Sequence, residues 1–117
     1  MAIKEKRKHF RIDSLHLLNY LHYGDSEDDV TQGMGRTLNV SESGILLETH
    51  TPIGPEENVS LTIGIEEDMV DIKGKVIYSK KNAAGMYEAG IEFFVMSDSA
   101  KEILNAYIVA FNARSKK

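Results

Sequence analysis

Apolar and polar residues alternate along short runs in the second half of the chain. Every second residue from Val59 to Ile65 is a large apolar one, which predicts a half-buried β-strand. The next run places one face of a strand on Val70, Ile72, Gly74, Val76 and Tyr78. The last run has the apolar residues Ala89, Ile91, Phe93 and Val95. Turns of hairpin length at 66–68 and 80–85 separate these runs, which indicates an antiparallel sandwich or barrel.

The first half of the chain alternates less regularly. Residues 12–23 predict a strand whose alternation breaks between Leu17 and Leu18, so a bulge is expected there, and a short helix is the competing interpretation. Residues 33–40 predict a second strand, and 45–49 a third. The second strand has Met34, Arg36, Leu38 and Val40 on one face, and Gly35, Thr37 and Asn39 on the other.

The stretch Ser41-Glu42-Ser43-Gly44 lies between these two strands and predicts a hairpin or a sharp corner. Gly44 either takes a backbone conformation closed to residues with a Cβ or allows another group to approach closely. Turn formation alone would account for Asn39, Ser41 and Gly44. Residues 51–55 contain both prolines and mark a break before the next strand.

The pattern changes its period near the C-terminus. Ile103, Leu104, Tyr107, Ile108 and Phe111 fall on one face of a helix, so we expect an amphipathic helix over residues 97–113. Its cap is Ser97 or Ser99, and Ser99 with Glu102 fits a capping box. The apolar face has to cover an open side of the barrel or a partner chain.

Composition limits the class of protein. The chain has 117 residues, 42% of them hydrophobic and 27% charged, which is typical of one soluble domain. It has no cysteine, so disulfides and cysteine-based metal sites are excluded. No apolar run approaches the roughly 18 residues of a membrane span, and the N-terminus lacks the apolar segment of a secretory signal. We expect a cytoplasmic protein with no membrane insertion.

The net charge of −4 is unevenly distributed. Residues 1–11 have five cations against Glu5 alone, whereas the acidic residues dominate from 12 to 110. We expect residues 1–11 to form a basic arm, although basic runs are often only solvated tails. A basic arm on an acidic body suits a discrete anionic ligand, and it suits DNA or RNA poorly because a long polyanion would also meet the acidic body.

No pattern indicates catalysis or a metal site. No nucleophile with a neighbouring base and no glycine-rich phosphate loop is visible, so we expect a protein that is not an enzyme. The acidic loop 24–29 lacks the ligand spacing of an EF-hand. The four histidines have no ligand-like spacing and are expected at the surface or at strand edges: His9, His16, His22 and His50.

Two short motifs offer binding chemistry. Arg7 and Arg11 form an RxxxR pattern in the basic arm, and Asn39, Ser41 and Gly44 form a [D/N]xSxxG pattern in the predicted hairpin. An arginine fork can pair with phosphate oxygens or with guanine O6 and N7, and it can stack on a base. Asn and Ser offer short donors and acceptors to a base edge. Together these residues suit a small, doubly phosphorylated purine ligand.

The two motifs, with Ala89-Gly90-Ile91-Glu92-Phe93 behind them in the same order, resemble the PilZ domain, a bacterial receptor module for cyclic di-GMP. The resemblance implies a mainly β fold, namely a six-stranded antiparallel split barrel over residues 12–117 with the C-terminal helix. It also implies cyclic di-GMP as ligand, with no cofactor, bound by Arg7, Arg11, Asn39, Ser41 and Gly44. Lys6, just before the first arginine, occupies the position that sets ligand stoichiometry in the family.

The resemblance therefore predicts a receptor whose arm changes conformation on binding cyclic di-GMP and signals to a downstream partner protein. The alternative on the same barrel is a protein–protein adaptor that needs no nucleotide. A third interpretation, a nucleic-acid binder of the OB type, would need aromatic residues interleaved with Lys and Arg on a strand face, which this chain lacks.

Overall fold

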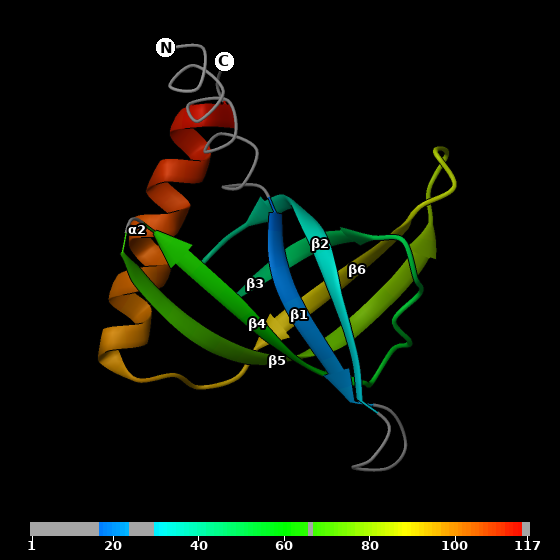
Figure 1. Cartoon of the computed structure of the whole chain (residues 1–117), viewed down its shortest axis with the longest axis horizontal. Helices are drawn as coiled ribbons and strands as arrows, with labels where there is room; N and C mark the ends of the chain where they lie inside the picture. The colour runs from blue at the N-terminus through cyan, green and yellow to red at the C-terminus, as the bar shows by residue number, and fades with distance from the viewer. Residues whose placement is uncertain (1–16, 24–29, 66, 116–117) are drawn as a thin grey trace.

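The computed structural model describes residues 17–23, 30–65 and 67–115, which form six β-strands and one α-helix (Figure 1). The elements are, in chain order, β1 (Leu17–Tyr23), β2 (Val30–Val40), β3 (Gly44–Thr49), β4 (Asn58–Ile65), β5 (Asp68–Lys81), β6 (Tyr87–Phe93) and α2 (Asp98–Ser115). The predicted strand 12–23 is thus described from Leu17 onward, and it is a strand rather than the competing helix.

The six strands form a closed barrel in the order β1-β2-β3-β6-β5-β4, and every neighbouring pair is antiparallel. The pair β1–β4 closes the barrel, with Tyr20 opposite Gly33 on one side and opposite Leu61 on the other. The predicted six-stranded antiparallel barrel with a C-terminal helix is therefore confirmed. The register of β1 is regular from Leu17, so the bulge expected at Leu17–Leu18 is not present in the described strand.

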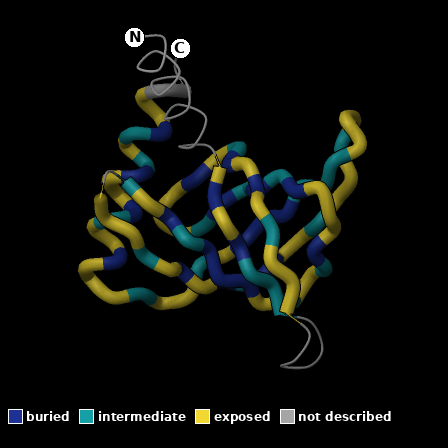
Figure 2. Tube along the Cα trace, viewed as in Figure 1, coloured by how far each residue is buried: buried dark blue, intermediate teal, exposed yellow. Residues whose placement is uncertain are grey.

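The alternating apolar residues fill the barrel. Val59, Leu61 and Ile63 of β4 are buried, as their period of two predicts, and Ile53 of the preceding loop is buried with them. Figure 2 shows that buried positions lie along the strands and on one side of the helix, while most loops are exposed. Each fully buried aliphatic side chain contributes about 1.5–3 kcal/mol to folding, so this interior is the main source of stability.

Two β-bulges correct the predicted strand faces. In β2 the register shifts between Thr37 and Asn39, so that Thr37 and Val40 are both buried although they are an odd number of residues apart. In β5 the register shifts between Val76 and Tyr78, and Tyr78 is 44% exposed. The assignment of Val40 to the face of Met34 was therefore wrong, as was the assignment of Tyr78 to the face of Val76. An extra residue in one strand reverses the alternation beyond it.

The helix α2 packs against β4 and β5 and buries Leu104, Tyr107 and Phe111, which confirms the predicted apolar face. The hydroxyls of Tyr107 and Thr37 form a buried hydrogen bond of 2.8 Å, which joins the helix to β2. Ser97 caps the helix, because its Oγ accepts the backbone N–H of Ala100 at 3.2 Å.

Two details at this end of the chain differ from the predictions. Ser99 lies inside the first turn of α2, so the capping box with Glu102 does not form. The strand β6 ends at Phe93, so Val95 lies outside the strand that was predicted to contain it, and it is fully exposed. The backbone N–H of Phe94 still bonds the carbonyl of Lys73, and the chain then turns away toward the helix.

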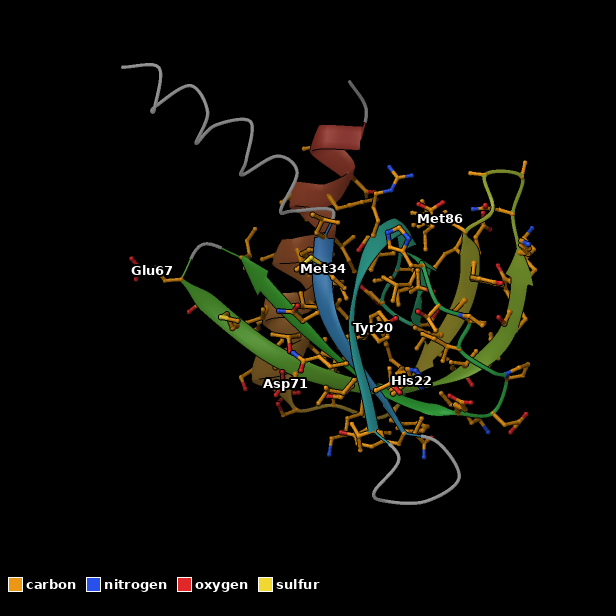
Figure 3. All side chains as sticks on the ribbon, turned by 45° about the vertical axis from the view of Figure 1, so that its right-hand side comes forward. Tyr20, His22, Met34, Glu67, Asp71 and Met86 are labelled. Carbon is orange, nitrogen blue, oxygen red and sulfur yellow. The ribbon has the colours of Figure 1, made fainter. Side chains whose placement is uncertain are left out.

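The hairpins β4–β5 and β5–β6 end on opposite sides of the barrel, as Glu67 and Met86 mark in Figure 3. The amide of Asn82 organises the β5–β6 hairpin. Its Oδ1 accepts the N–H of Met86 at 3.0 Å, and its Nδ2 donates to Glu48 and Glu88 at 2.8 and 3.1 Å. Because Glu48 and Glu88 face each other across β3 and β6, the amide lies between two like charges.

Candidate ligand-binding site

An open pocket of about 230 Å³ lies on the barrel surface between the β2–β3 hairpin and the neighbouring parts of β5 and β6. It brings together three of the residues that the sequence predicted as a site, namely Asn39, Ser41 and Gly44. The remaining lining comes from apolar residues and one further glycine: Val40, Ile45, Leu46, Ile77, Tyr78, Gly90 and Ile91.

The hairpin is held by its own side chains. The backbone N–H of Ser41 bonds the carbonyl of Gly44 at 2.8 Å, which closes the turn. Asn39 Oδ1 accepts the N–H of Val40 at 3.0 Å, and Ser41 Oγ accepts the N–H of Ser43 at 3.3 Å. The turn-forming interpretation of these residues is therefore realised. Since Oδ1 is engaged, the two N–H groups of the Asn39 amide are the donors that this exposed side chain can offer to a ligand.

Gly44 is required for close approach and not for an unusual backbone angle. It pairs with Glu92 at the start of β3, and its φ is not positive. A Cβ at this position would collide with the backbone carbonyl of Ile91. The backbone N–H of Phe93 also bonds the carbonyl of Ser43 at 2.9 Å, which ties the turn to the end of β6. Of the two roles predicted for Gly44, close approach is confirmed.

The side of the pocket formed by β5 and β6 was missed by sequence reasoning. The bulge in β5 leaves Ile77 54% and Tyr78 44% exposed, side by side on the pocket. Tyr78 is opposite Gly90 in the register. The signal that could have located this side is the adjacent apolar pair Ile77–Tyr78, which breaks the alternation of the strand, followed by a glycine in the next strand.

The pocket carries no charged side chain among its lining residues. Its polar groups come from Asn39, Ser41 and the backbone, and the rest of its surface is apolar. Such a lining can accept the face of a flat apolar or aromatic group and bond its edge, but it has no cation for a phosphate. The cationic residues predicted for the site, Lys6, Arg7 and Arg11, lie outside the described residues.

The histidine of β1 differs from its prediction. The side chain of His22 is only 12% exposed, and its Nδ1 lies 2.9 Å from Glu57 Oε1. The residue is half-buried near the end of β1, and its ring lies 6.0 Å from that of Tyr20 between centroids (Figure 3). His50 is exposed, as predicted. Within the described ranges no group of three potential metal ligands occurs, and no helix there is both long and apolar enough to span a bilayer.

A model of the PilZ domain family matches residues 5–110 of the chain. The chain belongs to the PilZ domain family. The match includes the RxxxR pattern, the hairpin motif and the strand that carries Gly90, in the order that the sequence resemblance predicted. No curated protein matches the sequence.

Solved structures of PilZ proteins have the same fold. The Bacillus subtilis inhibitor of motility MotI (DgrA) superimposes with a TM-score of 0.65 at 11% identity, covering 86% of this chain and 49% of that one. The PilZ domain of Escherichia coli YcgR with c-di-GMP gives 0.60 at 9% identity, covering 86% and 85%. The K. pneumonia MrkH–c-di-GMP complex gives 0.59 at 14% identity, covering 86% and 50%. The chain spans about half the length of MotI and MrkH.

Proposed function

We propose that this PilZ domain is a cytoplasmic receptor for cyclic di-GMP, and not an enzyme. The observation that carries the proposal is the pocket, which gathers Asn39, Ser41 and Gly44 of the hairpin motif at one place on the barrel surface. The c-di-GMP in the YcgR and MrkH structures supports the same ligand class.

The pocket and the arm would bind different parts of the ligand. Cyclic di-GMP has two guanines and two phosphodiesters. The uncharged pocket suits a guanine, whose O6 and N7 would accept from the Asn39 amide. The phosphodiesters need cations, and the arm supplies Arg7 and Arg11, whose planar forks can pair with phosphate oxygens. Lys6 would then adjust how many ligand molecules bind together.

Signalling would follow from the division of the chain into an arm, residues 1–11, and a barrel with its helix, residues 12–117. Ligand that contacts both parts lowers the free energy of the conformation in which the arm lies against the barrel. The surface formed in this way would be recognised by a downstream protein. The coupling can only be as large as the difference in ligand affinity between the two conformations of the arm.

Calorimetric titration of the full chain with cyclic di-GMP tests the proposal. We expect saturable binding that Arg7→Ala or Arg11→Ala abolishes. Arg36→Ala is the matched control, since Arg36 is an exposed arginine of β2 that pairs with Glu48 at 3.2 Å and does not line the pocket. Its affinity for cyclic di-GMP should equal that of the unmodified chain.

Absence of heat at high micromolar cyclic di-GMP would contradict the proposal. So would equal loss of affinity in the Arg36→Ala control, because the loss would then reflect net charge and not a site. Capture of a partner protein that needs no nucleotide and survives Arg7→Ala would favour the adaptor alternative.

A further inference from the structure

Tyr78 has an unusual position for a large aromatic residue. The bulge between Val76 and Tyr78 turns its side chain out of the barrel, where it is 44% exposed and lines the pocket. The backbone of Val76 is held by two hydrogen bonds to the loop before β4, from Glu56 N–H to its carbonyl at 2.8 Å and from its N–H to the carbonyl of Glu57 at 2.9 Å. The position of the bulge is therefore fixed by a third segment of chain.

Gly90 provides the space that the Tyr78 ring occupies. Gly90 lies directly opposite Tyr78 in β6, and a Cβ built on Gly90 would come within 2.5 Å of Tyr78 Cε2 and 2.8 Å of Cδ2. Any other residue at position 90 would push the ring away. The ring thus covers the backbone of β6 next to the hairpin motif, as aromatic residues do when they cover a glycine in a neighbouring strand.

The size of the pocket limits what it can hold. At about 230 Å³ it is smaller than the roughly 300–1,000 Å³ of a pocket that encloses a whole drug-sized ligand. It has room for one part of a dinucleotide, such as a single base. A base needs an apolar or aromatic surface for its face and donors or acceptors for its edge, and here Tyr78 and the Asn39 amide lie on the same pocket.

We propose that Tyr78, seated by Gly90, is the platform on which one purine base of the bound cyclic dinucleotide stacks, and that it contributes affinity to the site. This inference rests on the proposed function. Stacking on an aromatic side chain is strong and tolerates any flat base, so Tyr78 supplies affinity while the Asn39 amide distinguishes guanine, with two acceptors on that edge, from adenine, with one acceptor and one donor.

Substitutions at Tyr78 separate stacking from simple covering of Gly90. Tyr78→Phe keeps the aromatic face and should bind cyclic di-GMP within about twofold of the unmodified chain. Tyr78→Leu still covers Gly90 but has no aromatic face, and should bind about tenfold to a hundredfold more weakly. Gly90→Ala leaves Tyr78 in the chain but displaces its ring, and should weaken binding in the same direction.

Tyr87→Leu is the matched control, because Tyr87 is the first residue of β6 and does not line the pocket. Its affinity should be unchanged. A second measurement reports on the stacking contact itself: in the NMR spectrum of ligand bound at saturation to the folded chain, one guanine H8 should move upfield because it lies over an aromatic ring, and this shift should vanish with folded, saturated Tyr78→Leu.

The outcomes distinguish this inference from the function on which it rests. If the unmodified chain binds no cyclic di-GMP, both fail. If it binds, and Tyr78→Leu binds equally well with the same H8 shift, then the receptor function stands and the stacking role of Tyr78 is wrong.

Discussion

The strand β2 serves two different parts of the molecule within three residues. Thr37 points inward and bonds Tyr107 of the helix at 2.8 Å, in a setting where both residues are almost fully buried. Asn39, beyond the bulge, points outward and lines an open pocket. The side with Thr37 is buried and apolar, and the hydroxyl of Thr37 is hydrogen-bonded within it. The side with Asn39 is exposed and offers N–H donors that no described residue uses.

The comparison predicts that stability and the proposed binding of cyclic di-GMP are separable in this barrel. The helix side derives its energy from buried area and one buried hydrogen bond, whereas the pocket side has exposed Asn39, Ser41, Ile77 and Tyr78, whose removal costs little stability. The bulge makes this separation possible, because without the extra residue Asn39 would share a face with Thr37.

Leu104→Ala should have the largest effect on stability. Leu104 is 2% exposed between the helix and the barrel, and truncation of such a leucine costs about 2–5 kcal/mol. Urea unfolding measures this loss. Affinity for cyclic di-GMP, measured under conditions where the variant is folded, should stay within twofold. A large loss of affinity in the folded variant would show that the two sides are not separable.

Tyr107→Phe should have the second-largest effect on stability. It keeps the ring but leaves the buried Thr37 hydroxyl without this bond, which costs about 1–3 kcal/mol. Tyr87→Phe, at a partly exposed site, should change the free energy of unfolding by less than about 0.5 kcal/mol. Equal effects in the two variants would mean that the Thr37–Tyr107 bond contributes nothing to stability.

High pH should lower the stability of the side of the barrel that α2 covers. Burial raises the pKa of Tyr107 above its usual value of 10.0, although its hydrogen bond with Thr37 opposes the shift. The tyrosine of the unfolded chain therefore ionises first, so this contribution to stability is complete below about pH 10 and is lost as the pH rises further.

Above about pH 10 the free energy of unfolding can fall by about 1.4 kcal/mol per pH unit for each tyrosine with a raised pKa. Burial also raises the pKa of Tyr20, so Tyr107→Phe should reduce the pH dependence and not abolish it. Urea unfolding of both proteins near pH 9 and near pH 11 checks this, and an unchanged dependence would contradict the assignment to Tyr107.

The smallest effect is expected from Asn39→Asp. Asp can still accept the N–H of Val40, but it has no N–H donor for guanine O6 and N7. We expect affinity for cyclic di-GMP to fall by less than about tenfold, with unfolding unchanged, as calorimetry and urea titration would show. A rise in affinity would indicate that this side chain accepts from the N1–H and N2–H₂ groups of guanine and does not donate to O6 and N7.

The features that could be predicted from the sequence are those that follow a regular pattern of apolar residues. The period of two in β4 and the period of the helix identified their buried faces, since both patterns reflect burial on one side of a regular element. Irregular features were missed. The bulges at Thr37–Asn39 and Val76–Tyr78 depend on pairing with distant strands, which no local pattern records. His22 was expected at the surface or at a strand edge, and its hydrogen bond with Glu57 joins residues that are 35 apart in the sequence.

Part of the candidate site could also be predicted from a local sequence pattern. Asn39, Ser41 and Gly44 were found because they lie within six residues, so a local motif reveals them. Tyr78 and Gly90 meet only through the β5–β6 register and were not recognised. The arm residues Arg7 and Arg11 lie outside the described residues, and their contact with the pocket stays a prediction.

The most direct test is an NMR titration of the labelled full chain with cyclic di-GMP, followed through its backbone amide signals. The account predicts that the largest changes centre on the hairpin residues 39–46, on Ile77 and Tyr78, on Gly90, and on the signals of Arg7 and Arg11. Changes centred on the exposed face of α2, or no changes at saturating cyclic di-GMP, would contradict the claim that this pocket is the binding site.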